Sequence, residues 1–434
     1  TSRAGQVIEQ LFPEVTAEID WQKVAVANAL SRQFTIIGGG PGTGKTFAVT
    51  KILAALQILA EQPLKIAMIA PTGKAAQRLN ESIQKTKSDF LRDGLVDNSV
   101  LNVIPDSAGT VHRLLGVIPG SHDFRYNQNR TLPYDVILVD EISMIDLPLM
   151  SRLMRALNNN CRIIMLGDAD QLPSVAAGSV LSDLAPGQAP GYSPDAAQKM
   201  NDLTGFKLPR IESSQLNLDY LTVLQKSRRF DGSGEIGCLA GAVIKGDAQQ
   251  SWNILQQGKK QIEPIVSGSF YPWLEKLLEQ YYSPLFADNI DINSAFSQLK
   301  QFRFLAATRL GEQGVINLNH TIEQSLRKKG LITISHHLYP GRPVMVTENH
   351  YGIGLYNGDT GLLWPDKEGK LQAVFPQNDS LRWLSIGRLP KVETVYAMTI
   401  HKTQGSEFNH VALVLPENDS LVLSRELLYT GITR

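Results

Sequence analysis

The stretch IIGGGPGTGKTF, residues 36–47, decides the class of fold. It contains the pattern G-x-x-x-x-G-K-[ST], directly after an apolar strand pattern and directly before a helical one. Glycines let backbone N–H groups turn inward around phosphate oxygens, the lysine reaches the outer phosphates, and the threonine hydroxyl suits Mg²⁺. A glycine turn ahead of a helix is the alternative, but both flanks favour a phosphate loop. The residues expected to bind nucleotide are Gly39, Gly40, Pro41, Gly42, Thr43, Gly44, Lys45 and Thr46.

Around this loop, short apolar strands alternate with helical stretches through the first 190 residues. Continuous apolar strands separated by helices indicate a parallel sheet that is covered on both faces. We therefore predict an α/β P-loop domain over residues 1–190, with a polar, turn-rich insert at about 116–133 that reads as a surface hairpin or loop. The predicted strands are FTII at 34–37, KIAMIA at 65–70, DVILVD at 135–140 and RIIMLG at 162–167.

The second half of the chain again alternates strand and helix patterns, and these patterns flank a segment made of short strands alone. Strand patterns at 302–308 and 410–416 belong to a second α/β unit, predicted over residues 191–434. Between them, short alternating strands with NGD and DKEGK turns predict a small all-β insert at about 335–392.

Composition limits the possible functions. A chain of 434 residues is too long for one core, which rarely exceeds about 300 residues. Lys plus Arg equals Asp plus Glu, 42 against 42, so nucleic-acid binding must be local and only modestly salt-dependent. Two cysteines exclude a disulfide framework and fit the cytoplasm. No apolar run approaches the roughly 20 residues that span a bilayer, so we expect no membrane partner.

Acidic residues follow two of the predicted strands. Asp140 and Glu141 leave the strand at 135–140 together, where one carboxylate can hold Mg²⁺ and its neighbour can activate water. Plain helix caps are the alternative, but their position after a phosphate loop favours hydrolysis. Asp168, Asp170 and Gln171 follow the strand at 162–167, where the glutamine can sense a γ-phosphate; a polar turn before a proline is the alternative.

These elements, in this order, resemble superfamily 1 helicases, and further motifs resemble the RecD family, especially the RecD subunits of RecBCD (exonuclease V). The resemblance covers almost the whole chain. The motifs are DWQ at 20–22, APTGKAAQRL at 70–79, TVHRLLG at 110–116, LQKSRRF at 224–230, GRPVMVTENHYGIGLYNGDTGLL at 341–363, YAMTIHKTQGSEF at 396–408 and LLYTGITR at 427–434.

The resemblance implies two tandem RecA-like motor domains, with a hairpin inserted in the first and a small SH3-like β-barrel in the second. It implies an ATP- and Mg²⁺-dependent helicase that moves 5′-to-3′ along single-stranded DNA, unwinds duplex ends and serves double-strand break repair and recombination. RecB-like and RecC-like subunits are the implied partners. We expect an amino-terminal docking region and a segment beyond Arg434 in the native protein, and slow hydrolysis from a chain ending at Arg434.

The resemblance also implies roles for single residues. Gln22 would contact adenine, Lys45 and Thr46 the phosphates and Mg²⁺, Asp140 the metal, Glu141 the attacking water, and Gln171 the γ-phosphate. Arg229 and Arg434 would act as arginine fingers beside Gly405 and Glu407, with Arg228 the alternative to Arg229. The implied DNA contacts are Pro71, Thr72, Thr110, His112, Thr399, His401 and Lys402, although His112 and His401 taken singly would be structural histidines.

Three other functions remain open at this point. A nucleotide-driven protein switch would share the phosphate loop and the acids, but has no use for the strand-contacting motifs. A free-standing RecD-like helicase differs from a complex subunit only in its partners. A scaffold without activity is disfavoured, because the catalytic positions named above are intact.

Overall fold

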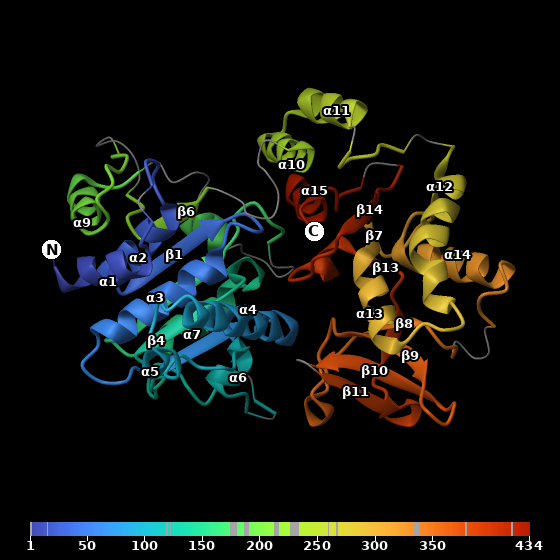
Figure 1. Cartoon of the computed structure of the whole chain (residues 1–434), viewed down its shortest axis with the longest axis horizontal. Helices are drawn as coiled ribbons and strands as arrows, with labels where there is room; N and C mark the ends of the chain where they lie inside the picture. The colour runs from blue at the N-terminus through green and yellow to red at the C-terminus, as the bar shows by residue number, and fades with distance from the viewer. Residues whose placement is uncertain are drawn as a thin grey trace. The chain divides into compact units, whose positions relative to one another are not determined.

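The computed structural model describes most of the chain in two compact units, Thr1–Asp231 and Gly232–Arg434 (Figure 1). The described residues are 2–14, 16–118, 120–121, 123–173, 180–185, 191–211, 217–225, 234–258, 260–265, 268–333, 338–377, 380–417 and 420–434.

The first unit is built on a six-stranded sheet in the order β3-β2-β4-β5-β1-β6, with every described strand pair parallel. Strands β1, β2, β4 and β5 coincide with the four apolar runs predicted at 34–37, 65–70, 135–140 and 162–167, whereas β3 and β6 were not predicted. The strands are β1 Phe34–Gly39, β2 Ile66–Ala70, β3 Gly109–Thr110, β4 Val136–Val139, β5 Arg162–Gly167 and β6 Leu221–Leu224.

Helices cover both faces of this sheet, because successive strand residues point to opposite sides. In β4, Val136 and Leu138 join one core, whereas Ile137 and Val139 join the other. Helices α1, α2, α3, α4 and α9 line the first core, and α6, α7 and α8 line the second. Their bounds are α1 Arg3–Leu11, α2 Trp21–Ser31, α3 Lys45–Leu59, α4 Gly73–Arg92, α5 Asn98–Leu101, α6 Val111–Leu115, α7 Leu147–Arg155, α8 Val180–Leu184 and α9 Pro194–Thr204.

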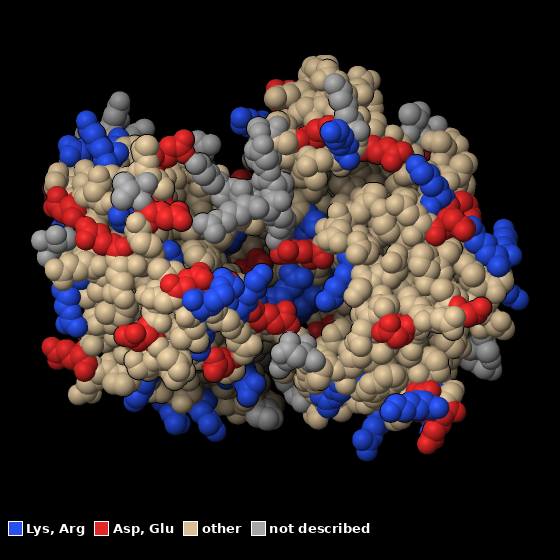
Figure 2. Space-filling model, in the orientation of Figure 1, with Lys and Arg blue, Asp and Glu red and all other residues tan. Residues whose placement is uncertain are grey.

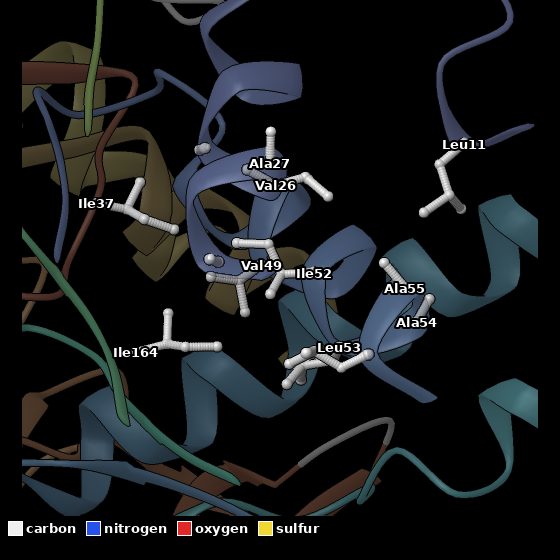
Figure 3. Close-up of a cluster of buried hydrophobic side chains, with 14 of the residues drawn as sticks. Leu11, Val26, Ala27, Ile37, Val49, Ile52, Leu53, Ala54, Ala55 and Ile164 are labelled. Atoms are coloured by element: carbon white, nitrogen blue, oxygen red, sulfur yellow. The ribbon is translucent and has the colours of Figure 1, made fainter. Parts of the chain in front are cut away.

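Helix α3, which begins at the phosphate loop, is buried along most of its length. Figure 3 shows Val49, Ile52 and Leu53 of this helix in one cluster with Ile37 of β1 and Ile164 of β5. Each of these side chains is fully buried, which contributes about 1.5–3 kcal/mol for a large aliphatic group. The helix that carries the lysine is therefore held rigidly against the sheet.

The first unit extends past residue 190, where the sequence had suggested that the second unit begins. Strand β6 pairs with β1 in the register Ile36↔Leu221, and helix α9 contributes to the first core. The chain is rich in Pro and Gly after residue 186, but strand β6, which follows this stretch, completes the edge of the first sheet. Such long-range pairing leaves no local signal in the sequence.

The insert at about 116–133 contains two isolated antiparallel bridges in its described part. They join Val117 to Phe124 and Asn127 to Arg130. The guanidinium of Arg130 lies 5.4 Å from the ring centre of Tyr126. The described part of the segment is thus a bridged loop at the surface.

The second unit is built on a three-stranded parallel sheet in the order β13-β7-β14. Aromatic residues fill its core, with the rings of Phe302 and Phe304 4.8 Å apart and edge to face. The strands are β7 Phe302–Ala306, β13 Ala397–Thr399 and β14 His410–Val414; the helices are α10 Glu235–Lys245, α11 Ala248–Gln257, α12 Phe270–Leu277, α13 Ile292–Gln301, α14 Val315–Lys328 and α15 Arg425–Ile432.

An antiparallel sheet is inserted between β7 and β13 in the order β11-β10-β9-β8-β12. One set of its side chains, including Leu363 and Phe375, forms a core of its own, while Leu362 and Val374 join the core of the second unit. The strands are β8 Pro343–Val346, β9 Thr360–Pro365, β10 Leu371–Gln377, β11 Ser380–Ser385 and β12 Val392–Thr394. The predicted α/β class with an antiparallel insert is confirmed; closure of this sheet into an SH3-like barrel stays a prediction.

Surface charge agrees with the balanced composition. Figure 2 shows Lys and Arg interspersed with Asp and Glu over the visible face of each unit. Within the described ranges, no helix combines the length and the apolar character needed to cross a membrane.

Candidate functional site: a phosphate loop and two strand-end edges

The phosphate loop connects β1 to α3 through glycines with left-handed backbones. Gly42 and Gly44 have φ of 74° and 83°, which side chains with a Cβ rarely adopt. Gly44 is the N-cap of α3, so no side chain caps this helix. The first turn of α3 also contains no acidic residue. The amino end of α3 therefore presents backbone N–H groups and a positive dipole end toward the loop.

Gln22 lies against this loop from the first turn of α2. Its amide Nε2 donates to the Thr43 carbonyl at 3.2 Å, and the side chain is only 8% exposed. Asp20 caps α2 by accepting from the N–H groups of Gln22 and Lys23, which fixes where the helix begins. A Cβ on Gly44 would overlap Nε2 of Gln22, so a larger residue there would require the Gln22 amide to move.

Lys45 folds back over the loop. Its Nζ donates to the carbonyls of Gly39 at 2.6 Å and Gly40 at 3.1 Å, and the Thr43 hydroxyl donates to the Gly40 carbonyl at 2.9 Å. Thr46 is half-buried in the first turn of α3. The ammonium is thus held where the loop turns around the expected phosphate position.

The acidic pair follows β4, the second strand along from β1 in the sheet. The Asp140 N–H donates to the Ile69 carbonyl at 2.8 Å, and Asp140 Oδ1 accepts from the Glu141 N–H at 2.8 Å. Glu141 has φ 52° and ψ 45°, and among the described residues it is the one non-glycine with positive φ. Such strain, about 1–3 kcal/mol, is concentrated at functional sites in proteins.

The buried carboxyl groups of Asp140 and Asp168 both interact electrostatically with Lys45. Burial, reinforced by the Glu141 carboxylate, raises the pKa of Asp140 to about 7, and the charge of Lys45 opposes the rise. Burial likewise raises the pKa of Asp168 to about 6, again against the charge of Lys45. The lysine therefore lies within electrostatic reach of both acids. Two buried carboxyl groups within the electrostatic reach of the phosphate-loop lysine supply oxygen donors of the kind that fits Mg²⁺.

Gln171 is held by Asp168. Its Nε2 donates to Asp168 Oδ2 at 3.1 Å, and both residues are buried, at 5% and 3% exposure. Asp168 was not among the residues expected to act, although it stands directly after β5, beside the strand that carries the loop. Its position directly after a predicted strand and three residues before Gln171 is the sequence signal that could have identified it.

The expected strand-contacting residues of the first unit lie at the ends of β2 and β3. These strands pair through Ala70↔Thr110, so the four residues Pro71, Thr72, Thr110 and His112 lie at or just after two neighbouring strand ends. Thr72 Oγ1 accepts from the Ala75 N–H and Thr110 Oγ1 from the Arg113 N–H, each at 3.2 Å. Because each oxygen accepts from a backbone N–H, its own proton is left to donate elsewhere. His112 is exposed and lies edge-on to the ring of Phe124.

The second unit repeats this arrangement after β13. Thr399 Oγ1 caps the short helix Ile400–Thr403 by accepting from the Lys402 N–H at 3.4 Å. The Lys402 Nζ donates to Glu393 at 2.5 Å. His401 is half-buried, and burial lowers its pKa.

Arg434 is held beside the segment that carries Gly405 and Glu407. Its carbonyl accepts from the Phe408 N–H at 2.9 Å, and the residue is 8% exposed. Gly405 has φ 73°, and Glu407 is exposed. Arg228 and Arg229, the alternatives for the other arginine finger, lie outside the described residues.

Two family models match the chain, one in each unit. An AAA domain matches residues 22–177, and a UvrD-like helicase C-terminal domain matches residues 394–434. A structure of Bacteroides Pif1 bound to ssDNA matches 97% of this chain and 90% of that chain at 15% identity, with a TM-score of 0.48. The α/β fold of this chain is therefore assigned from the strand orders of its own sheets.

Curated relatives match along nearly the whole chain. The RecBCD enzyme subunit RecD of Haemophilus influenzae is 41% identical over 453 residues, 99% of this chain and 69% of the relative. The same subunit of Mycolicibacterium smegmatis is 37% identical over 100% of this chain and 72% of the relative. The ATP-dependent RecD2 DNA helicase of Deinococcus radiodurans is 28% identical over 93% of this chain and 46% of the relative.

The phosphate loop, the acids and the strand-end motifs thus occur in a chain that matches RecD subunits of the RecBCD enzyme over 99% and 100% of its length. The chain belongs to the RecD family of RecBCD enzyme subunits and is an ATP-dependent DNA helicase of superfamily 1.

Proposed function

We propose that this chain is the 5′-to-3′ motor of a RecBCD-type complex, which uses ATP with Mg²⁺ to move along single-stranded DNA and unwind duplex ends during break repair. The observation that carries the proposal is a shared edge. Lys45 and the acids follow β1, β4 and β5, while Thr72 follows β2 and Thr110 ends β3 of the same parallel sheet. ATP hydrolysis at one part of this edge can therefore alter the binding of single-stranded DNA at the other part.

In the proposed mechanism, Lys45 exchanges the Gly39 and Gly40 carbonyls for phosphate oxygens, and the N–H groups of Gly42 and Gly44 donate to the same phosphates. Gln22 contacts adenine. Thr46 and Asp140 would hold Mg²⁺, which neutralises phosphate charge when bound.

Glu141 accepts a proton from the attacking water, and its backbone is in a left-handed conformation directly after Asp140. Gln171, fixed by Asp168, contacts the γ-phosphate and responds to its loss.

The second unit supplies the remaining groups. We assign to Arg434, and to Arg229 or its neighbour Arg228, the stabilisation of charge on the transferring phosphoryl group, with Gly405 and Glu407 lining the nucleotide. Support comes from the hydrogen bond that seats Arg434 against Phe408. Alternate gripping by Pro71, Thr72, Thr110 and His112 and by Thr399, His401 and Lys402 then produces net stepping.

RecB-like and RecC-like subunits in the cytoplasm are the proposed partners, supported by the identity to RecD subunits of the RecBCD enzyme. The lower identity to the RecD2 helicase makes a free-standing helicase the second candidate. Co-purification with those two subunits decides between them: a chain that stays alone while they are co-expressed would support the second.

The test of the motor is Lys45→Gln, measured on substrates with a 5′ or a 3′ single-stranded overhang. We expect the parent chain to unwind only the 5′ substrate and the variant to lose both ATPase and unwinding. Lys85→Gln, at an exposed position of α4, is the matched control and should keep both activities. Unwinding by the Lys45 variant would overturn the mechanism, and ATPase that single-stranded DNA does not stimulate would favour a protein switch.

A further inference from the structure

One carboxylate in the second unit is shared by two cations. Glu393 Oε1 accepts from Lys402 Nζ at 2.5 Å, and Glu393 Oε2 accepts from Arg309 Nη2 at 3.0 Å. The side chains of Glu393 and Lys402 are 23% and 28% exposed, whereas that of Arg309 is 58% exposed. Each carboxylate oxygen thus faces one cation at a partly solvated site.

The three residues meet because of the sheet topology. Strands β7 and β13 are parallel neighbours in the register Ala306↔Thr399, so Arg309 and Lys402 follow adjacent carboxyl ends. Glu393 arrives from a different sheet, since it belongs to β12, an edge strand of the β insert that pairs with β8. The insert therefore places a negative charge on the edge where the motor sheet presents two positive ones.

The chemistry of this group suits an exchange of anions. Lys and Arg bind a phosphate oxygen through the same charge-assisted N–H donors that bind a carboxylate. Partly exposed ion pairs are weak, so a phosphate that neutralises both cations can displace the carboxylate. Arg309 was not among the expected strand contacts, yet it donates to the same carboxylate as Lys402.

We propose that Glu393 is an internal counter-ion that competes with the phosphates of single-stranded DNA for Lys402 and Arg309. The inference rests on the proposed function, in which Lys402 contacts the strand. The carboxylate weakens the grip of the second unit and returns to the cations when the strand leaves. Binding in the parent chain therefore exchanges one anion for another, and this lowers both the affinity and its salt dependence.

The test is Glu393→Gln, which keeps the side-chain shape and removes the charge. Binding of a fluorescein-labelled oligo-dT is followed by anisotropy over a series of NaCl concentrations. We expect about three- to ten-fold tighter binding at low salt, with the slope of log K against log salt steeper by up to about 1. Glu368→Gln, at an exposed position in the turn before β10, makes the same change in net charge and should alter neither value.

Further variants separate this inference from the proposed function. Lys402→Gln and Arg309→Gln should each weaken binding, and Glu393→Gln should have no effect once both cations are gone. If these two variants bind like the parent chain, the proposed strand contact is wrong. If they weaken binding but Glu393→Gln does not strengthen it, only the counter-ion role is wrong. Thermal melts establish that each variant is folded, and Glu393→Ala must shift affinity in the same direction.

Discussion

At the scale of single residues, the nucleotide site contains charges that destabilise the fold around it. Asp140 and Asp168 have raised pKa values because they are buried, and the positive charge of Lys45 offsets only part of this rise. The left-handed backbone of Glu141 adds strain beside them. These residues are therefore better explained by the chemistry proposed for them than by stability.

Stability should reflect these acids in its pH dependence. A carboxyl group whose folded pKa lies above its unfolded value favours folding at low pH, and this contribution is lost as pH rises from about 4 to about 7 for Asp140. We expect Asp140→Asn to raise the free energy of unfolding at pH 8 by about 1–4 kcal/mol without Mg²⁺ or nucleotide, and to abolish ATPase.

Urea titrations at pH 5, 6, 7 and 8 measure this effect. The parent chain should lose stability across the series, and the Asp140→Asn variant should lose less. Glu368→Asn, at an exposed position, is the control. Equal pH profiles for the parent and the Asp140 variant would show that Asp140 is not held in an unfavourable charged state.

Gly44 provides a second prediction at this scale. Its φ of 83° disfavours any Cβ, and a Cβ there would also overlap the Gln22 amide. We expect Gly44→Ala to lower the free energy of unfolding by about 1–3 kcal/mol and to weaken ATP binding at least ten-fold. Gly94→Ala, in the turn after α4, measures what a positive φ alone costs the fold, because Gly94 has φ 63° and nothing within 4 Å of its Cβ position. If both variants lost ATP affinity to a similar extent, the contact of Gly44 with Gln22 would not be the cause of that loss.

At the scale of elements, a buried amide joins α2 to β6. Asn28 Nδ2 donates to the Asp219 carbonyl and to Thr222 Oγ1, each at 3.0 Å, and Asn28 Oδ1 accepts from Arg32 Nε at 3.1 Å. The Tyr192 hydroxyl, just before α9, also bonds to Thr222. This network attaches the edge strand β6 to the helix that bears Gln22, and so ties the end of the first unit to its nucleotide site.

Replacing this amide should loosen the edge of the sheet. We expect Asn28→Leu to lower the free energy of unfolding by about 2–4 kcal/mol, because the buried Asp219 and Thr222 and the partly exposed Arg32 each lose a hydrogen bond. Denaturant unfolding measures it, with Asn102→Leu at an exposed position as the control. A loss below about 0.5 kcal/mol would mean that the partners find other hydrogen bonds in the variant.

The β insert shows a comparable attachment in the second unit. Glu323 of α14 accepts from the Tyr339 hydroxyl at 2.7 Å and from the Thr394 hydroxyl at 3.3 Å. Tyr339 precedes the first strand of the insert and Thr394 ends its last strand. One buried carboxylate therefore anchors the chain both where it enters the insert and where it leaves it.

At the scale of the whole molecule, the proposed catalytic groups are divided between two units. The phosphate loop and the acids lie in the first, and Arg434 lies in the second. Such a division suits a motor, because hydrolysis then depends on a group that binding of the nucleotide must recruit.

Arg434→Ala should therefore separate binding from turnover. We expect the dissociation constant for ATP to change less than about five-fold, and kcat to fall by about 10³ or more, as for arginine fingers in other nucleotide hydrolases. DNA-stimulated ATPase and nucleotide binding are measured on the same samples. Arg327→Ala, at an exposed position of α14, is the control. Unchanged turnover in the Arg434 variant would exclude the finger role.

The sequence by itself determined the α/β class, the phosphate loop and the helicase family, because these depend on local patterns. Gly39 to Thr46, Asp140 with Glu141, and the motifs at 396–408 and 427–434 are each short enough to read without contacts. An apolar run that is followed by glycines or acidic residues marks the end of a strand in the sequence, and this mark does not depend on the strand's place in the sheet.

Only the tertiary structure decided where the first unit ends, which acid holds Gln171, and which anion faces Lys402. Strand β6 pairs with β1 across about 185 residues of sequence. Asp168, which follows β5, interacts electrostatically with Lys45. Glu393 forms ion pairs with Lys402 and Arg309 from a separate sheet. Pairing and electrostatics of this kind depend on distances in space, and residues far apart along the chain carry no local mark of the partner they will meet.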